Sequence, residues 1–222
     1  MTAPPLPPEL RARVLASVAK TPAPPAAWPR RVLVSGAVGA VWLGAAYAWL
    51  GLRMDWSELP LVYSAGTLVA LALSASVLSV AALARGREML GLPVRFLLAA
   101  ISLVPLGVLV WVSLVRGHGP STVMFPSIGA SLARGSACDF ISLGLAIPLT
   151  ALLLRLKRDA LVGAPILGGA SIGAAAATWA HVVVHAHCPV GNLSHALVGH
   201  LLPIVPVMLV GALAAVRLVR LR

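Results

Sequence analysis

Long apolar runs, separated by short polar segments, fill the chain from Val32 onward. Six runs meet or approach the roughly 20 residues that a helix needs to cross a hydrocarbon layer about 30 Å thick. They cover residues 32–52, 60–84, 96–115, 137–154, 160–184 and 196–216. Because the runs are continuous rather than alternating, and richer in Ala and Leu than in β-branched residues, they favour helices over strands. The pattern therefore predicts an all-α, polytopic membrane protein with a bundle of six transmembrane helices.

Basic residues between the runs predict how the bundle is oriented. Of 17 Lys and Arg residues, all but Arg53, Arg116 and Arg134 fall on the side that carries the N-terminus. Cytoplasmic loops are enriched in Lys and Arg, so we expect this side, with both termini, to be cytoplasmic. The predicted parts are a cytoplasmic N-terminal segment at 1–31, a transmembrane domain at 32–216 and a basic cytoplasmic tail at 217–222.

Composition narrows the class of protein further. The chain is 59% hydrophobic and only 10% charged, whereas a soluble domain carries about 25% charged residues. It has no serine-nucleophile motif, no Gly-rich phosphate loop and no pair of catalytic carboxylates, so we expect no catalytic residues and no enzymatic activity. The net charge of +11 is divided into small groups between apolar runs, which indicates topology signals rather than direct nucleic-acid binding.

Residues 9–20 predict a short amphipathic helix within the N-terminal segment. Leu10, Val14, Leu15 and Val18 share one face at helical spacing. An isolated helix of about 12 residues is marginal in water, so this apolar face requires a partner. The residues alone leave two partners open: the anionic membrane surface and a groove on another protein.

Small residues predict where the helices pack closely, because lipid is as apolar as the helices themselves. Gly169 and Gly173 form a GxxxG pattern in the fifth run, and Gly36, Ala40 and Gly44 form a similar face on the first run. Packing within one chain is favoured over a dimer interface, and the oligomeric state is left open.

Histidine and cysteine gather at the side of the membrane opposite the termini. Five of the six histidines lie within twenty residues around one of the two cysteines. This group comprises His181, His185, His187, Cys188, His195 and His200. The other cysteine, Cys138, lies at the start of the fourth run beside Asp139, and His118 is alone in an earlier loop.

Three interpretations of this group compete. The cysteines form a structural disulfide, as an oxidising periplasm allows; or thiolates and imidazoles sense oxidants or bind soft cations; or the side chains are merely hydrogen-bonded at a wet interface. Their spacing matches no compact zinc motif, but polar groups concentrated near a membrane raise the expectation of function. No cofactor is certain, and transient heavy-metal or zinc binding is the candidate.

Two stretches carry a family resemblance: ACDFISLGLAIP around Cys138 and HCPVGNLSHALVGHLLP from His187 onward. Together with the short N-terminal segment and six runs, they resemble the NrsF family. These are multi-pass anti-sigma factors of the bacterial inner membrane, which regulate extracytoplasmic-function sigma factors negatively. The resemblance implies that Cys138 and Cys188 sense oxidative or heavy-metal stress.

The resemblance also bears on the histidines and on the N-terminal helix. His187, His195 and His200 fall on the family's histidine pattern, whereas it gives His181 and His185 no support. It makes the apolar face of the N-terminal helix the candidate docking surface for the sigma factor. The alternative, from a different class, is a metal- or haem-handling membrane protein that uses the same histidines and cysteines.

Overall fold

The computed structural model describes a bundle of helices. It covers residues 7–10, 12–13, 16, 28–83, 94–115, 128–157, 161, 164–189, 195 and 197–220, and within these ranges it contains no strand. The elements are α2 (Trp28–Leu50), η1 (Trp56–Glu58), α3 (Leu61–Leu83), α4 (Val94–Val115), α5 (Ile128–Lys157), α6 (Pro165–His187), η4 (Leu197–Leu201) and α8 (Ile204–Arg220). The predicted all-α fold is confirmed.

Four segments among the described residues are long and apolar enough to cross a bilayer. They are Leu61–Leu83, Gly135–Lys157, Pro165–His187 and Leu197–Arg220, and Gly36–Leu50 is a shorter apolar helix. Large apolar side chains lie on the outside of the bundle, where a membrane protein meets lipid tails. The structure therefore supports a membrane protein, whereas the number of six spans and the N-terminal helix stay predictions.

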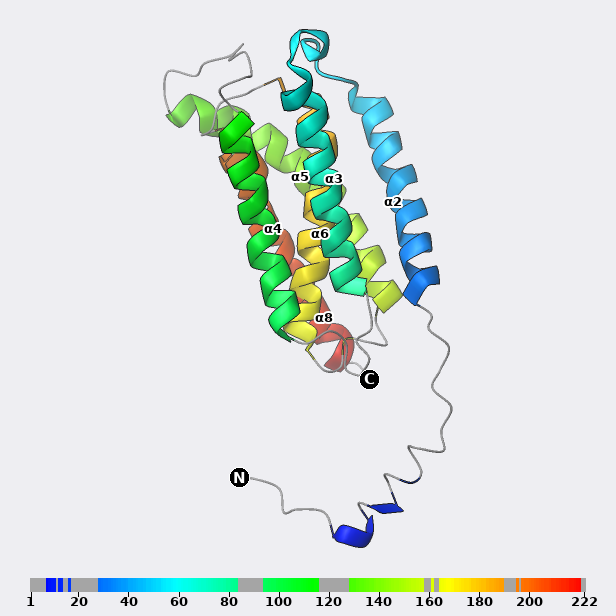
Figure 1. Ribbon diagram of the computed structural model, residues 1–222. Coiled ribbons are helices and arrows are strands. Elements are labelled where there is room, and N and C mark those ends of the chain that lie inside the picture. The colour runs from blue at the N-terminus through cyan, green and yellow to red at the C-terminus, as the bar shows by residue number, and fades with distance from the viewer. Residues whose placement is uncertain are drawn as a thin grey trace.

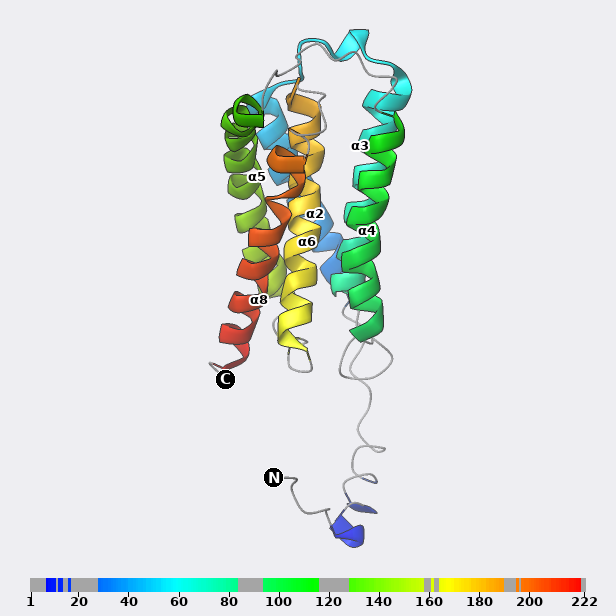
Figure 2. The ribbon, with the colours of Figure 1, turned by 90° about the vertical axis from the view of Figure 1, so that its left-hand side faces the viewer.

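Successive long helices run up and down the bundle (Figures 1 and 2). α2 begins and α8 ends at the same end of it (Figure 1). We call this the basic end, because exposed arginines lie there; they are Arg30, Arg95, Arg155, Arg217 and Arg220. The opposite end, where α2 ends and α5 begins, is called the outer end. The positive-inside rule assigns the basic end to the cytoplasm, and this orientation stays a prediction.

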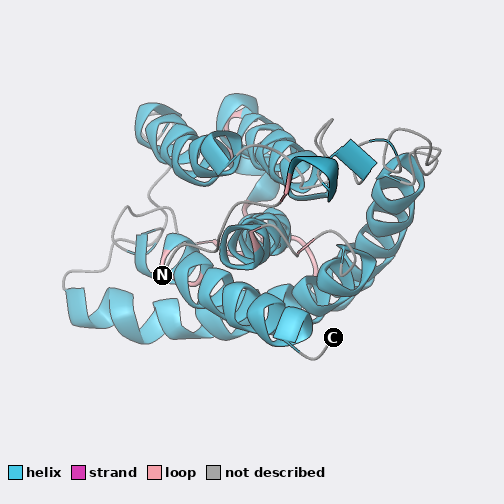
Figure 3. Ribbon diagram, turned by 90° about the horizontal axis from the view of Figure 1, so that it is seen from below, coloured by secondary structure: helices cyan, strands magenta, loops and turns pink. Residues whose placement is uncertain are grey.

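α6 lies in the middle of the bundle and contacts α2, α3, α4, α5 and α8 (Figure 3). Its sequence explains this position, because residues 168–177 are all Gly, Ala, Ser or Ile and nearly all buried. Small side chains let neighbouring backbones approach from several directions, which is how helices associate in lipid.

The closest approach is between α6 and α8. Cβ atoms on Gly169 and Gly173 would overlap the carbonyl oxygens of Gly211 and Val207. This confirms that the GxxxG pattern packs within the chain. The similar face predicted on α2 is wrong in part, because a Cβ on Gly36 or Gly44 would meet no other part of the bundle within 4 Å. Gly36 instead borders an apolar cavity of about 220 Å³ between α2, α3, α5 and α6.

Two of the observed helices do not begin and end where the predicted apolar runs do. α5 begins at Ile128 rather than at residue 137, because small polar residues can be helical without being apolar. The last run divides into η4, a single π-helical turn, and α8. The division falls at Leu202 and Pro203, since proline has no N–H to continue a helical ladder.

Replacing Gly173 by Ala tests the α6–α8 contact. The added methyl group would lie 2.8 Å from the Met208 Cα, so we expect the free energy of unfolding to fall by about 1–3 kcal/mol, the usual cost of overpacking. The matched control is Gly144→Ala on α5, where nothing lies within 4 Å of the new Cβ. Denaturant unfolding in detergent, followed by circular dichroism, measures both variants; equal losses would contradict the packing described.

Candidate functional site

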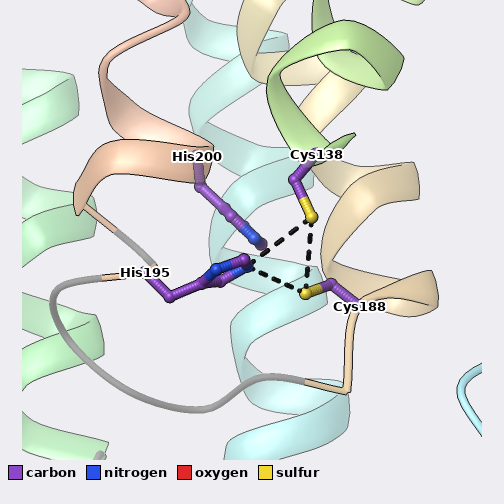
Figure 4. A group of neighbouring side chains, drawn as sticks. All are labelled: Cys138, Cys188, His195 and His200. Carbon is purple, nitrogen blue, oxygen red and sulfur yellow. Dashed lines mark hydrogen bonds between the residues drawn. The ribbon is translucent and has the colours of Figure 1, made fainter. Parts of the chain in front are cut away.

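Four side chains converge at the outer end from three parts of the chain, which are α5, the end of α6, and the positions 195 and 200 that follow it (Figure 4). Cys138 lies in α5, Cys188 is the residue that ends α6, and His200 lies on η4. His195 comes from the segment between α6 and η4. Both cysteines and His195 are buried, and His200 is half-buried. We call these four residues the Cys/His cluster.

The donor atoms of the cluster are within a few ångströms of one another. Cys138 Sγ lies 3.6 Å from Cys188 Sγ. His195 Nε2 lies 3.5 Å from Cys138 Sγ and 3.2 Å from Cys188 Sγ. With His200 included, one ligand atom from each residue lies within 4.8 Å of all the others. The four side chains therefore form one compact site rather than two separate pairs.

The cysteines are free thiols in this arrangement. The Cys138 thiol donates a hydrogen bond to Cys188 Sγ. That hydrogen bond lowers the pKa of the Cys188 thiol; burial opposes the shift, and the neighbouring imidazoles of His195 and His200 add to it. A thiolate is the form that binds metals and attacks oxidants, and the direction of this pKa shift favours Cys188 as the thiolate of the pair.

The spacing of the two sulfurs and His195 Nε2 fits a tetrahedral metal ion. Zn–S bonds of about 2.3 Å and Zn–N bonds of about 2.0–2.1 Å place two sulfurs about 3.8 Å apart and a sulfur about 3.6 Å from a nitrogen. The observed separations of 3.6, 3.5 and 3.2 Å are close to these values. Two thiols and two imidazoles are also the donor types that zinc and softer cations prefer.

One carboxylate lies next to the cluster. Asp139 follows Cys138 in α5 and interacts electrostatically with His200 and His195. Its Oδ1 is buried with no hydrogen-bond partner among the described residues. Histidines that bind metals usually donate their second N–H to a carboxylate or carbonyl, which orients the ring. Asp139 is the group available for that role here.

The other histidines near the end of α6 point elsewhere. His181 is buried and donates from Nδ1 to Ala177 O, 2.6 Å away, on its own helix. Its ring meets the His200 ring edge-on, with centroids 6.0 Å apart. His185 packs against the Tyr63 ring at 5.7 Å. His181 and His185 therefore border the site without joining the four donors.

His187 and Arg53 form a different set of contacts at the outer end. His187 Nδ1 donates to Gly51 O over 3.2 Å. Arg53, whose side chain is only 1% exposed, pairs with Asp55. Sequence reasoning treated Arg53 only as a basic residue on the minority side of the membrane. The available signal was the Arg-Met-Asp spacing in a short loop, which lets an arginine pair with a carboxylate two residues later.

A comparison with protein families decides what kind of protein carries this site. The family model described as NrsF, negative regulator of sigma F, matches residues 15–221. The chain belongs to the NrsF family. No curated protein and no solved structure matches it. As an NrsF-family member, the protein is a negative regulator of a sigma factor, which is a regulatory role rather than that of a known enzyme family.

The predicted site residues divide between the cluster and other parts of the protein. The structure brings Cys138 and Cys188 together with His195 and His200, whereas His187 lies outside the cluster. Leu10 is exposed. The rest of the predicted docking face, Val14, Leu15 and Val18, and also His118, lie outside the residues whose side chains are described.

The separation of the two sulfurs predicts how this NrsF-family protein reacts with peroxide. We expect hydrogen peroxide to join Cys138 and Cys188 in an intramolecular disulfide; the two thiols give up two protons and two electrons, and the peroxide is reduced to water. Mass spectrometry would record the loss of two hydrogens and of alkylation by N-ethylmaleimide. In the control Cys188→Ser, no such disulfide can form. Two thiols that stay open to alkylation after oxidation would contradict the geometry.

Proposed function

We propose that this protein is an anti-sigma factor of the bacterial inner membrane with a sensor at its outer end. It holds an extracytoplasmic-function sigma factor at the basic end and releases it when the Cys/His cluster binds a soft divalent cation or when its thiols are oxidised. The observation that carries the sensing half is the convergence of four metal-type donor atoms within 4.8 Å from three parts of the chain. The family match carries the regulatory half.

The proposed topology places sensor and output on opposite sides of the membrane. Exposed arginines at the basic end favour the cytoplasm, where a sigma factor is found. Residues 1–31 would lie on that side and contact the sigma factor. Their docking surface would be the apolar face formed by Leu10, Val14, Leu15 and Val18. A helix-in-groove contact of this kind uses such apolar positions as anchors.

The proposed mechanism starts from where the ligands are attached. A cation held by Cys138, Cys188, His195 and His200 would fix the beginning of α5, the end of α6 and η4 relative to one another. A disulfide would fix only α5 and α6. Either event favours one packing of the outer end over another, and a bundle with two packings can pass that preference to its far end.

The paired substitution Cys138→Ser with Cys188→Ser tests the sensor. We expect repression of the sigma factor to persist, because the basic end is unchanged, and induction by Cd²⁺ or peroxide to be lost. A reporter gene under the sigma factor's promoter measures both. Normal induction in this variant would show that the cysteines have no sensing role.

Replacing His195 by Ala separates metal sensing from thiol oxidation. We expect Cd²⁺ affinity to fall by at least about tenfold, the smallest loss usual for groups that support a metal site, while peroxide induction persists. His187→Asn is the matched control, since it removes a histidine next to Cys188 but outside the cluster. Titration of the purified protein with Cd²⁺ gives the affinities; equal values for both variants would remove His195 from the site.

Charged residues placed on the apolar face of the N-terminal helix test whether this face binds the sigma factor. Leu10→Glu with Val14→Glu is expected to abolish co-purification of the sigma factor, because a carboxylate cannot enter an apolar groove without a large desolvation cost. Arg11→Gln with Arg13→Gln, off the apolar face, is the control. Retained co-purification in the Glu variant would contradict docking there. The membrane-surface alternative predicts instead that the peptide of residues 1–20 binds anionic vesicles and not the sigma factor.

The cluster geometry also favours a second candidate, a metal-handling protein without a sensing role. The two are separated by the metal content of the resting protein. Stoichiometric metal in protein that carries no sigma factor favours metal handling, whereas metal-free protein that co-purifies with a sigma factor favours the sensor.

A further inference from the structure

The loop between α2 and α3 is bound to the end of α6 on both sides of Cys188. The Arg53 backbone N–H donates to Ala186 O over 3.0 Å. Its Nη2 donates to Pro189 O, also over 3.0 Å. The His187 ring adds its hydrogen bond to Gly51 O. We call this set of contacts, together with Asp55, the Arg53 latch.

Arg53 is built into this position rather than resting on a surface. Its Nε and Nη2 donate to the two carboxylate oxygens of Asp55 over 2.6 and 2.7 Å. Burial alone would lower the pKa of the guanidinium, but the hydrogen bond to Asp55 and the nearby carboxylate charge leave it raised. A two-pronged contact of this kind is specific to arginine, because the planar guanidinium matches a carboxylate and lysine does not.

The latch and the Cys/His cluster share a short piece of backbone. Ala186 and His187 precede Cys188 directly, and Pro189 follows it. Any backbone movement of Cys188 that accompanies binding of a cation or approach to Cys138 would therefore shift the groups that Arg53 and Gly51 bind. Through Gly51, the residue that follows α2, the shift would reach the outer end of that helix.

α2 is the helix best placed to respond. One face of it is open, with Val41 73% and Trp49 85% exposed. Toward the basic end its Gly36, Gly39 and Ala40 border the 220 Å³ cavity. Within the bundle it hydrogen-bonds α5 through Trp42 Nε1 and Leu145 O, 3.1 Å apart. By contrast, α8 is fixed against α6 by the glycine contacts, so it would move with α6 rather than relative to it.

We propose that the Arg53 latch transmits a change at the Cys/His cluster to α2, and through α2 to the residues that precede it. Arg53 is a positioning residue, because it touches the backbone on either side of Cys188 and not the sensed ligand. The role of this coupling in signalling rests on the proposed sensing function. Its physical content, that Cys188 and α2 move together, can be measured separately.

Hydrogen–deuterium exchange of the full-length protein in lipid nanodiscs, with and without Zn²⁺, measures that coupling. In the wild type we expect Zn²⁺ to slow amide exchange at the ends of α5 and α6 and also to change it in the last turns of α2. In Arg53→Gln, which removes the side-chain contact to Pro189 but keeps the Arg53 backbone bond and the His187–Gly51 bond, we expect Zn²⁺ to bind with unchanged affinity and the change in α2 to be clearly smaller than in the wild type. Glu58→Gln, an exposed carboxylate in the same loop, is the control and should behave as the wild type.

Zinc affinity also serves as the check that a variant is folded. If Arg53→Gln does not bind Zn²⁺, then Asp55→Asn replaces it, because loss of the carboxylate charge weakens the two hydrogen bonds that hold the Arg53 guanidinium against Pro189. Arg53→Lys should restore less than the full response, because an ammonium cannot pair with both carboxylate oxygens. Full transmission in either removal variant overturns the proposal, as does a wild type whose α2 never responds.

Release of the sigma factor by Zn²⁺, measured on the co-purified complex, distinguishes the two claims. A wild type that transmits to α2 but keeps its sigma factor would contradict the proposed function and leave the latch standing. If the wild type and Arg53→Gln release the sigma factor equally, the proposed function stands and the proposed role of the Arg53 latch is contradicted. A protein that neither binds Zn²⁺ nor closes its disulfide would contradict both.

Discussion

The rest of the structure depends on the close approach of α6 to its neighbours, above all to α8. In lipid, apolar side chains gain little by meeting one another, so helices associate where backbones can come close. Gly169, Gly173 and Gly211 allow that approach, and the small residues between 168 and 177 allow it on several sides at once. α6 is therefore central, and whatever lies at its end meets several helices.

This central position explains why the chemistry of the chain is concentrated where it is. The last turns of α6 carry His181, His185 and His187, and the helix ends at Cys188. Cys138 reaches the same place from α5, and His200 from η4. The polar groups at this end therefore join elements that lie far apart in the sequence. A cation or a disulfide at such a site would fix the relative positions of these helices, which is the basis of the proposed sensing role.

Much of the fold could be predicted from the sequence, because apolar runs of membrane-spanning length have few alternatives. The all-α class and the family were predicted correctly, and so was the intrachain role of Gly169 and Gly173. The composition of the cluster could not be predicted from spacing alone. His187 is next to Cys188 in sequence yet faces Gly51, whereas His195 and His200 lie further along the chain and join Cys188 in the cluster. The buried state of Arg53 was missed for the same reason, since its partner Pro189 lies far along the chain.

The central claim is that Cys138, Cys188, His195 and His200 form one site for a soft cation. X-ray absorption at the zinc edge, on full-length protein in nanodiscs with one equivalent of Zn²⁺, tests it most directly. We expect two sulfur ligands at about 2.3 Å and two nitrogen ligands at about 2.0–2.1 Å. A shell of oxygen and nitrogen ligands without sulfur, or zinc that washes off the protein, would contradict the claim.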